Sequence, residues 1–453
     1  MTPPATLTQL TGWGRTAPSG AHVVPVTAGN VAEAVAGATD RGALVRGLGR
    51  SYGDAAQNGG GLVLRLAGDA GDAVLDEAAN EVTVGGGVSI DELLKVLVPR
   101  GFFVPVTAGT RFVTIGGAIA SDIHGKNHHI EGSFGNHVRR LSLLTADGST
   151  VELSPTLRPE LFWATIGGMG LTGIVLDATV HVWPIETSRC IVDTTRAHDL
   201  DHILTLMEEG DHRYRYAVAW IDLMAKGRHL GRSVLSRGDH ATLDQLPVDD
   251  RVNAREYHPH VLVGVPPIVP ISALNRVSIK AFNEMWFRKA PMYRTGELQT
   301  IPQYFHPLDM IGGWNQAYGP RGFVQYQILI PFGEEKALRA IIERLATSGA
   351  ASFVTVLKRF GAANPSPLSF PMPGWTLTLD IPAGTKGLAS MLHELDVVVL
   401  DAGGRHYMAK DSHTTPQAIR RGYPRLAEWQ AIRNEIDPDR VWQSDLARRL
   451  ELI

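Results

Sequence analysis

Residues 46–54 read Arg-Gly-Leu-Gly-Arg-Ser-Tyr-Gly-Asp and directly follow the short apolar run 43–45. Three glycines within seven residues allow the backbone to turn tightly and to bring several N–H groups onto one point. Such a concave set of donors suits a pyrophosphate. The segment lacks the Gly-Lys-Ser/Thr of a P-loop and the glycine spacing of the dinucleotide fingerprint, so alone it fits an ordinary strand-to-loop turn equally well.

Two further segments combine glycine with small and hydroxylated residues. Residues 105–121 contain PVTAGT and TIGGAIAS, and residues 163–175 read WATIGGMGLTGIV. Glycines in this pattern let a flat ring or a phosphate chain approach the main chain closely. Between these segments lie DIHGKNHH at 122–129 and GSFGN at 132–136.

The histidines of DIHGKNHH have three interpretations. His124 and His128 have the spacing of zinc ligands on a helix, but Gly125 and Asn127 oppose a helix and no glutamate lies between them as in HExxH. They could also be solvated loop histidines. Because three unusual segments occur together, we favour an active-site loop.

Composition limits the class of protein. The chain has 453 residues, 44% hydrophobic and 20% charged, with a formal net charge of -3, which predicts a globular protein of two or three domains and makes nucleic acid an unexpected partner. The single cysteine, Cys190, excludes an internal disulfide framework and fits a reducing compartment.

The chain predicts an α+β layout. Strands are expected at 22–26, 43–45, 62–66, 82–84, 141–146 and 173–182, helices at 31–38 and 90–97, and a hairpin turn at Asp147-Gly148. After Pro184 we expect strands at 189–194, 214–222, 323–330, 352–357 and 375–381, and helices at 199–209, 334–347 and 387–402. The weakly periodic, Pro- and His-rich stretch 227–310 predicts long loops.

No membrane-spanning or signal segment is expected. Residues 1–20 contain no apolar run, and the apolar stretch 260–274 is interrupted by Pro266, Pro267 and Pro270. We interpret residues 261–274 of that stretch either as a buried loop or as a mobile apolar lip. Peripheral attachment to a membrane stays open.

Together the glycine segments resemble the FAD domain of the vanillyl-alcohol-oxidase superfamily of FAD-linked oxidases. Short motifs along nearly the whole chain are similar to one family within it, the actinobacterial decaprenylphosphoryl-ribose 2′-oxidases. These motifs are GWGRT at 12–16, RGLGRSYGDAAQN at 46–58, DIHGKNHH, GSFGNHVR at 132–139, HPLDM at 306–310, GFVQYQ at 322–327, PLSFPMPGW at 367–375, AKDS at 409–412 and DLARRLEL at 445–452.

The resemblance implies a two-domain fold, a PCMH-type FAD-binding domain and a substrate domain with an antiparallel sheet. We expect residues 1–185 to form the first part of the FAD domain, 186–404 the substrate domain and 405–453 a return to the FAD domain. The implied cofactor-binding residues are Arg46, Gly47, Leu48, Gly49, Arg50, Ser51, Tyr52, Gly109, Thr110, Thr114, Gly116, Gly117, Ala120, Ser121, Ile123, His124, Gly125, Asn127, His128, Gly170, Thr172, Gly173, Ile174 and Tyr407.

The resemblance also implies the catalytic groups. Oxidation of an alcohol needs hydride transfer to the flavin and removal of the hydroxyl proton by a group within hydrogen-bond reach. By similarity Lys410 is expected at the substrate hydroxyl, as base or as hydrogen-bond donor, with His124 as a second polar group; a surface lysine paired with Asp411 is the alternative. The implied substrate-binding residues are Lys126, Trp220, Tyr304, Gln325, Gln327, Lys358, Thr376, Thr378 and Lys410, with His413 as a further candidate.

Two positions depart from family patterns. Covalently flavinylated members have a histidine where this chain has Arg50, so we predict non-covalent FAD. Thr376 and Thr378 stand where mycobacterial members have asparagine and a pocket cysteine. A neutral hydroxyl is a poor nucleophile without an activating base, so nitroaromatic inhibitors are expected to bind only reversibly.

The implied reaction is oxidation of the 2′-hydroxyl of decaprenylphosphoryl-β-D-ribose, the first half of an epimerisation to decaprenylphosphoryl-β-D-arabinose for cell-wall arabinan. The implied partners are a polyprenylphosphoryl-ribose lipid, a nicotinamide-dependent keto-reductase and a quinone-type electron acceptor, with the protein peripheral at the inner membrane on its cytoplasmic or periplasmic side. The alternatives are an FAD oxidase of a soluble sugar, polyol or aldonolactone, a non-catalytic FAD-binding scaffold and a zinc hydrolase.

Overall fold

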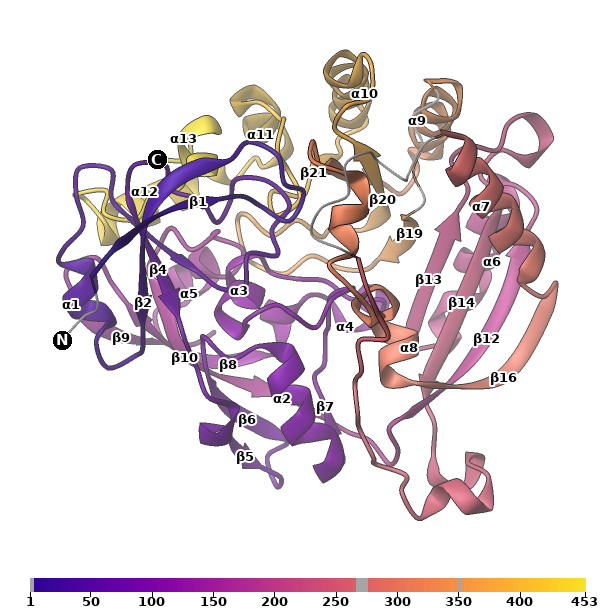
Figure 1. Ribbon diagram of the computed structural model, residues 1–453, viewed down its shortest axis with the longest axis horizontal. Helices are drawn as coiled ribbons and strands as arrows, with labels where there is room; N and C mark the ends of the chain where they lie inside the picture. The colour runs from indigo at the N-terminus through magenta and orange to yellow at the C-terminus, as the bar shows by residue number, and fades with distance from the viewer. Residues whose placement is uncertain (1–3, 266–275, 349–351, 353) are drawn as a thin grey trace.

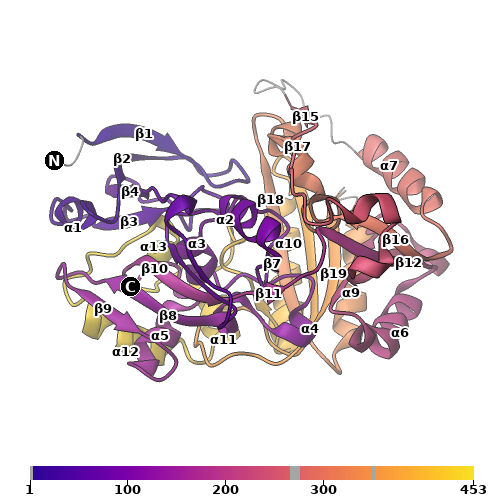
Figure 2. The same ribbon diagram turned by 90° about the horizontal axis from the view of Figure 1, so that it is seen from below.

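The computed structural model describes residues 4–265, 276–348, 352 and 354–453. Two of its sheets are formed by the first 181 residues (Figure 2). The first has the order β1-β2-β4-β3; β1 is antiparallel to β2, and β2, β4 and β3 are parallel. The second is antiparallel throughout, in the order β5-β6-β10-β8-β9. The strands are β1 (Thr6–Leu10), β2 (Ser19–Val26), β3 (Ala43–Arg46), β4 (Leu62–Leu66), β5 (Val74–Asp76), β6 (Glu81–Gly85), β8 (Val138–Leu144), β9 (Thr150–Leu153) and β10 (Ile174–His181).

A third, eight-stranded sheet dominates the rest of the chain. Its order is β16-β12-β14-β13-β19-β20-β18-β21, and all its neighbours are antiparallel. Its strands are β12 (Arg189–Ala197), β13 (Tyr216–Ile221), β14 (Ser233–His240), β16 (Tyr293–Thr300), β18 (Phe323–Pro331), β19 (Thr355–Phe360), β20 (Gly374–Pro382) and β21 (Arg405–His406). Two small pairs complete the strands, antiparallel β7 (Phe102–Phe103) with β11 (Trp183–Pro184), and parallel β15 (Val263–Gly264) with β17 (Ile311–Gly312).

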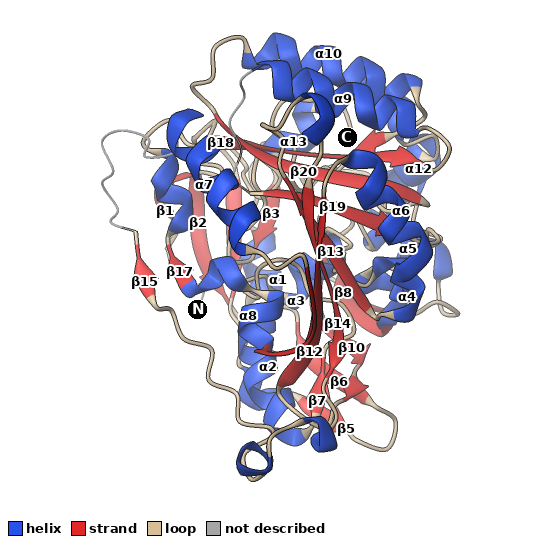
Figure 3. Ribbon diagram, turned by 90° about the vertical axis from the view of Figure 1, so that its right-hand side faces the viewer, coloured by secondary structure: helices blue, strands red, loops and turns tan. Residues whose placement is uncertain are grey.

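Helices α6, α9 and α10 cover one face of the eight-stranded sheet and enclose an apolar core with it. Figure 3 shows α9 and α10 side by side above β18 and β20. The opposite face of the sheet is therefore left to face the glycine-rich segments. The α-helices are α1 (Val31–Val35), α2 (Ile90–Leu97), α3 (Ile115–Ala120), α4 (His128–Glu131), α5 (Pro159–Thr165), α6 (Leu200–Gly210), α7 (Arg276–Lys289), α8 (Ile301–Phe305), α9 (Glu335–Ser348), α10 (Leu388–Asp401), α11 (Pro416–Gly422), α12 (Leu426–Ile436) and α13 (Asp445–Arg449).

The C-terminal segment packs back onto the N-terminal part of the chain: α12 contacts α5, and Figures 1 and 2 both show α13 close to the N-terminal strands. The Ala43 N–H donates to the Val441 carbonyl at 2.7 Å. Arg449 forms two hydrogen bonds with the Asp54 carboxylate, of 2.8 and 2.7 Å. Residues at the two ends of the chain thus hold the turn that follows the first glycine loop.

The predicted α+β layout is confirmed, including the hairpin at Asp147-Gly148, where Gly148 has φ 82° between β8 and β9. The expectation of long loops over 227–310 holds for residues 241–262, which form no α-helix or strand, and is wrong where β14, α7, β16 and α8 lie. β14 and β16 carry many polar residues and owe their conformation to pairing with β12 and β13, which local periodicity does not reveal. The expected apolar lip falls largely on residues 266–275, which lie outside the described residues. Within the described ranges, every helix is too short or too polar to cross a bilayer.

Candidate active site

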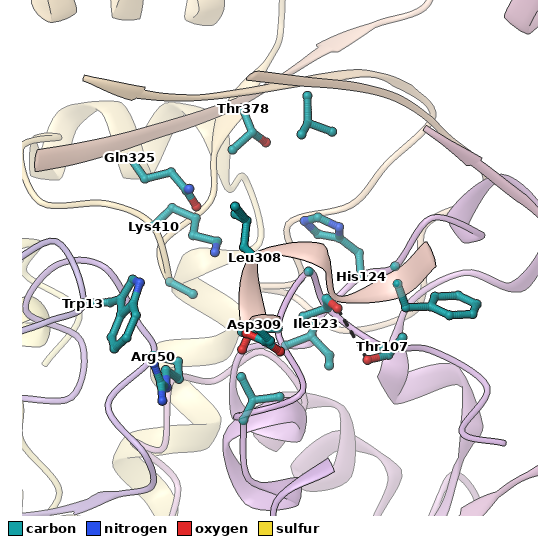
Figure 4. A pocket seen from close by; sticks show the side chains of 18 of the residues that line it. Trp13, Arg50, Thr107, Ile123, His124, Leu308, Asp309, Gln325, Thr378 and Lys410 are labelled. Carbon is teal, nitrogen blue, oxygen red and sulfur yellow. Dashed lines mark hydrogen bonds between the residues drawn. The ribbon is translucent and has the colours of Figure 1, made fainter. Parts of the chain in front are cut away.

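A cavity of about 990 Å³ lies between the glycine segments and the free face of the eight-stranded sheet (Figure 4). We call its two sides the glycine wall and the sheet wall. The glycine wall comprises the predicted cofactor residues Gly47, Leu48, Gly49, Arg50, Ser51, Tyr52, Gly109, Thr110, Thr114, Gly116, Gly117, Ala120, Ser121, Ile123, His124, Gly125, Gly170 and Gly173. The sheet wall comprises Thr194, Val218, Trp220, Val234, Ser236, Gln325, Gln327, Val356, Lys358 and Thr378.

The first glycine loop presents main-chain donors to the cavity. The N–H groups of residues 48–51 donate to no acceptor within the part of the chain that the structure describes. Gly49 adopts φ +65°, a left-handed conformation that costs glycine nothing. Beside the loop the Arg50 guanidinium lies 3.9 Å from the Trp13 ring centroid, and its buried Nε has no hydrogen-bond partner. Four free N–H groups and a half-buried cation fit a pyrophosphate.

The α3 segment provides the flat part of the glycine wall. Thr114 caps α3, and its Oγ1 accepts a hydrogen bond from the Gly117 N–H at 3.2 Å. A Cβ on Gly116 would lie 3.1 Å from the Gly86 carbonyl, so the backbones are in close contact there. A Cβ on Gly109 would meet nothing within 4 Å. The wall thus has room for a ring laid against the main chain at Gly109.

Five predicted cofactor residues lie behind this wall and support it. Arg46 donates to the carbonyls of Ala56 and Thr11 at 2.6 and 2.8 Å, and Asn127 donates to the Pro105 carbonyl at 2.7 Å. His128 Nδ1 accepts from the Gly361 N–H at 3.1 Å, and the Thr172 hydroxyl lies 3.0 Å from that of Thr165. The fifth residue, Ile174, is fully buried in β10.

Asp122 fixes the turn that carries His124. Its backbone has φ +40°, and its buried carboxylate accepts hydrogen bonds from the Gly135 N–H at 2.8 Å, from Ser133 Oγ at 2.8 Å, from Asn364 Nδ2 at 2.7 Å and from Ser369 Oγ. Burial raises the pKa of this carboxyl, although the hydrogen bonds oppose that shift. Sequence reasoning did not single out Asp122, because its partners come from segments more than 200 residues away as well as from its own loop.

The sheet wall follows the two-residue period of its strands. On β18, Gln325 and Gln327 face the cavity while Tyr326 and Ile328 lie in the opposite core, which confirms that the two glutamines share a face. On β20, Thr378 lines the cavity. Thr376 lies deeper, and its Oγ1 donates to the Ile328 carbonyl at 2.9 Å. Trp220 and Lys358 extend the wall on β13 and β19.

His124 reaches from the glycine wall to the sheet wall. Its Nε2 lies 2.9 Å from Gln327 Nε2, and its Nδ1 lies 2.9 Å from Lys358 Nζ. Burial, followed by the charges of Lys358, His128 and Lys410, holds the pKa of His124 well below its usual value. The imidazole is therefore neutral at neutral pH.

Lys410 enters the cavity from the C-terminal segment, close to Gln325 and opposite His124 (Figure 4). Its Nζ lies 3.9 Å from the Tyr52 ring centroid. Burial lowers the pKa of Lys410 to about 8, against the opposing charge of Asp380. Asp380 is fully buried and accepts a 2.5 Å hydrogen bond from Gln325 Nε2. Sequence reasoning missed Asp380, although the two-residue alternation from Thr378 would have found it.

The remaining predicted residues surround this centre. Lys126 donates to the Tyr304 carbonyl and lies 4.1 Å from the ring centroid of that tyrosine, and burial lowers its pKa to about 8. Tyr407 lines the cavity and donates to the Ser121 carbonyl at 2.8 Å. His413 lies outside the lining, 3.6 Å from Asp396 and 3.4 Å from Asp411.

Metal ligands are not brought together. Among the described residues, no three His, Cys, Asp or Glu side chains are grouped so that they could hold an ion. His128 instead packs against Phe360, with ring centroids 4.4 Å apart. The geometry thus gives the zinc interpretation no support.

Comparisons with known proteins support binding of FAD by this chain. A family model described as an FAD binding domain matches residues 20–154, and one described as D-arabinono-1,4-lactone oxidase matches residues 376–450. The chain is 46% identical to the decaprenylphosphoryl-beta-D-ribose oxidase of Mycolicibacterium smegmatis, over 99% of both chains. It is 25% identical to an alditol oxidase of a Streptomyces species over 94% of both chains, and 23% identical to the L-gulono-1,4-lactone dehydrogenase of Mycobacterium tuberculosis over 96% of both.

Proposed function

Because the chain belongs to the family of the decaprenylphosphoryl-beta-D-ribose oxidase of M. smegmatis, we propose that it oxidises the 2′-hydroxyl of decaprenylphosphoryl-β-D-ribose to a ketone. This reaction would be the first half of an epimerisation that yields decaprenylphosphoryl-β-D-arabinose for cell-wall arabinan. The observation that carries the proposal is a single cavity with an FAD cradle on one side and a polar sheet face carrying Gln325, Gln327 and Lys358 on the other.

The chain is an FAD-dependent oxidoreductase. The free N–H groups of residues 48–51 and the Arg50 Nε would hold the pyrophosphate, and the space at Gly109 would take the ring. When bound, FAD supplies the acceptor for the substrate's hydride. We propose that it is held non-covalently, because arginine at position 50 cannot form a histidyl–flavin bond.

The side chains of this protein would bind the sugar and manage its proton. Gln325 and Gln327 present amides to the cavity from one strand, a pattern suited to adjacent hydroxyls. Lys410 and His124 approach from opposite sides (Figure 4), so that the hydroxyl to be oxidised would lie between an amine and an imidazole. Close placement of such groups accounts for much of the rate of an oxidation of this kind.

The proposal is tested by mixing purified holoprotein with polyprenylphosphoryl ribose without oxygen. Bleaching of the visible flavin band, with formation of the 2′-keto lipid, is the expected result. A yellow protein that this lipid never bleaches would contradict it.

A soluble sugar, polyol or aldonolactone is not favoured as the substrate, because the relatives named for such compounds are only 25% and 23% identical. Faster bleaching by free alditols than by the lipid would reverse this preference.

We further propose a nicotinamide-dependent keto-reductase and a quinone-type acceptor as partners, and peripheral attachment to the inner membrane, since the substrate is a lipid. The domain limits stay a proposal too, with residues 1–185 and 405–453 binding FAD and 186–404 binding the substrate. The contacts of Ala43 with Val441 and of Asp54 with Arg449 support this division.

A further inference from the structure

Four polar side chains form one hydrogen-bonded row across the cavity: Lys358, His124, Gln327 and Thr376. Lys358 Nζ lies 2.9 Å from His124 Nδ1, His124 Nε2 lies 2.9 Å from Gln327 Nε2, and Gln327 Nε2 lies 3.1 Å from Thr376 Oγ1. The positions of the hydrogen atoms in this row follow from the number of hydrogens that each nitrogen or oxygen can donate.

The assignment starts at the buried end. A hydroxyl has one hydrogen, and Thr376 Oγ1 gives it to the Ile328 carbonyl at 2.9 Å. The threonine oxygen therefore accepts from Gln327 Nε2. The second hydrogen of that amide nitrogen is directed to His124 Nε2, and since an amide nitrogen cannot accept, His124 Nε2 carries no hydrogen. The reverse assignment needs the amide turned over and the Thr376 hydroxyl turned away from Ile328 as well.

The other end of the row follows from this result. A neutral imidazole has one N–H, which must then be on Nδ1, facing Lys358 Nζ. An ammonium has hydrogens only and could not accept it, so the Lys358 nitrogen must be a neutral amine with a free lone pair. One hydrogen of this amine is donated to the Gly125 carbonyl at 3.2 Å.

The surroundings of Lys358 favour the neutral form. Burial, then the positive charges of Lys410 and Lys126, lower its pKa to about 7. Burial and the neighbouring groups of Lys358, His128 and Lys410 also hold the pKa of His124 well below its usual value, so the imidazole carries a hydrogen on one nitrogen only. Lys410 differs, because the Asp380 carboxylate opposes the loss of its proton, although burial raises the pKa of this carboxyl itself to about 7. Lys358 and Lys410 thus suit opposite tasks.

We propose that Lys358 is the final proton acceptor of the oxidation, acting through His124, while Lys410 stays a cationic hydrogen-bond donor. The inference rests on the proposed function. The substrate hydroxyl displaces the Gln327 hydrogen from His124 Nε2, its O–H bond breaks, and its proton forms a bond with Nε2. The proton of Nδ1 passes to Lys358 Nζ, which becomes an ammonium. The hydride leaves carbon 2′ with its electron pair for FAD as the C=O bond forms.

The first test measures the rate of anaerobic flavin reduction against pH in the holoenzyme, in Lys358→Arg, Lys358→Met and the exposed control Lys95→Arg. Because an ammonium cannot accept, the wild-type rate should rise with pH through about 7 and fall as pH drops below it. Arginine keeps the donor but stays protonated, so Lys358→Arg should lose at least about 100-fold in rate and lose this acid limb. Lys95→Arg should behave as wild type.

A Lys358→Arg enzyme with the wild-type profile and a rate within about threefold would overturn the proposal, since a merely structural lysine tolerates that change. FAD content and thermal unfolding show whether each variant is folded. Wild-type protein that the lipid fails to bleach would count against the proposed function alone.

The second test needs no substrate. Nitrogen NMR of histidine-labelled holoprotein at pH 8, with His124→Gln to assign the signal, should show a hydrogen on Nδ1 and none on Nε2. In Lys358→Met the ring should lose this fixed tautomer. A hydrogen on Nε2 in the wild type would overturn the inference whatever the enzyme oxidises.

Discussion

The glycine wall and the sheet wall face the same cavity but present different chemistry to it. The glycine wall offers main-chain N–H groups and open space, as at residues 48–51 and at Gly109. The sheet wall offers side chains at every second residue of its strands, such as Gln325, Gln327 and Lys358. A backbone cradle suits a large, invariant cofactor, whereas alternating side chains can be changed one at a time to suit a substrate. The comparison supports the proposal that the main chain of the glycine wall binds the cofactor and the sheet wall binds the substrate, with His124 reaching from the first wall to the second.

The largest effect on the rate is expected for a substitution of Lys410, which lies in the cavity next to Gln325 of the sheet wall. Lys410→Met removes a group expected at the reacting hydroxyl, so anaerobic flavin reduction should slow by at least about 100-fold. The FAD content should stay unchanged, because the cradle is formed by the other wall. Stopped-flow absorbance measures the rate, with Lys95→Met as control. Reduction at the wild-type rate would remove Lys410 from the chemistry.

A substitution on the glycine wall should weaken the binding of FAD, which the Lys410 substitution should leave unchanged. Gly109→Leu places a bulky group in the open space of the cradle without strain, and should raise the Kd for FAD at least about tenfold. The exposed Gly29→Leu is the matched control. Flavin fluorescence on titration of the apoprotein gives the Kd. If FAD bound to Gly109→Leu as tightly as to the wild type, the ring would have to lie elsewhere.

The third change sharpens the contrast between the two lysines. Asp380→Asn keeps an acceptor for Gln325 but removes the negative charge that favours the Lys410 ammonium. The pKa of Lys410 should therefore fall below its value of about 8. Because the proposal needs the Lys410 ammonium, the rate should also fall as the pH rises through the pKa of Lys410. This alkaline limb should move to lower pH by about one unit in the variant, while the acid limb stays in place. An unmoved alkaline limb would mean that another group sets it.

The smallest change concerns one sheet-wall side chain. Thr378→Cys places a thiol in the cavity, and a thiolate is a far better nucleophile than a hydroxyl. Nitroaromatic inhibitors should add their mass to this variant and bind the wild type reversibly. Intact-protein mass spectrometry distinguishes the two. An adduct on wild-type Thr378 would contradict the prediction.

The two walls also differ in what the sequence reveals. The glycine loops have recognisable composition over a few residues, and most of the cofactor residues that the resemblance implied there line the cavity. The sheet wall depends on pairing between distant strands, so that Lys358 contacts His124, which lies 234 residues earlier in the chain. Asp122, in the loop of His124, likewise has hydrogen-bond partners from several loops. β14 and β16 were missed for the same reason: their polar sequences become strands only through their neighbours. Resemblance supplied Lys410 and Lys358, but neither Asp380 nor the direction of each hydrogen bond.

The contact between Arg449 and Asp54 joins residues 395 positions apart, and it has a consequence for biosynthesis. A nascent chain cannot close this bond until Arg449 has left the ribosome, so the turn after the first loop stays without its clamp while the residues between 54 and 449 are synthesised. Flavin loading should therefore follow synthesis of α13. A truncation of even the final helix should yield colourless protein.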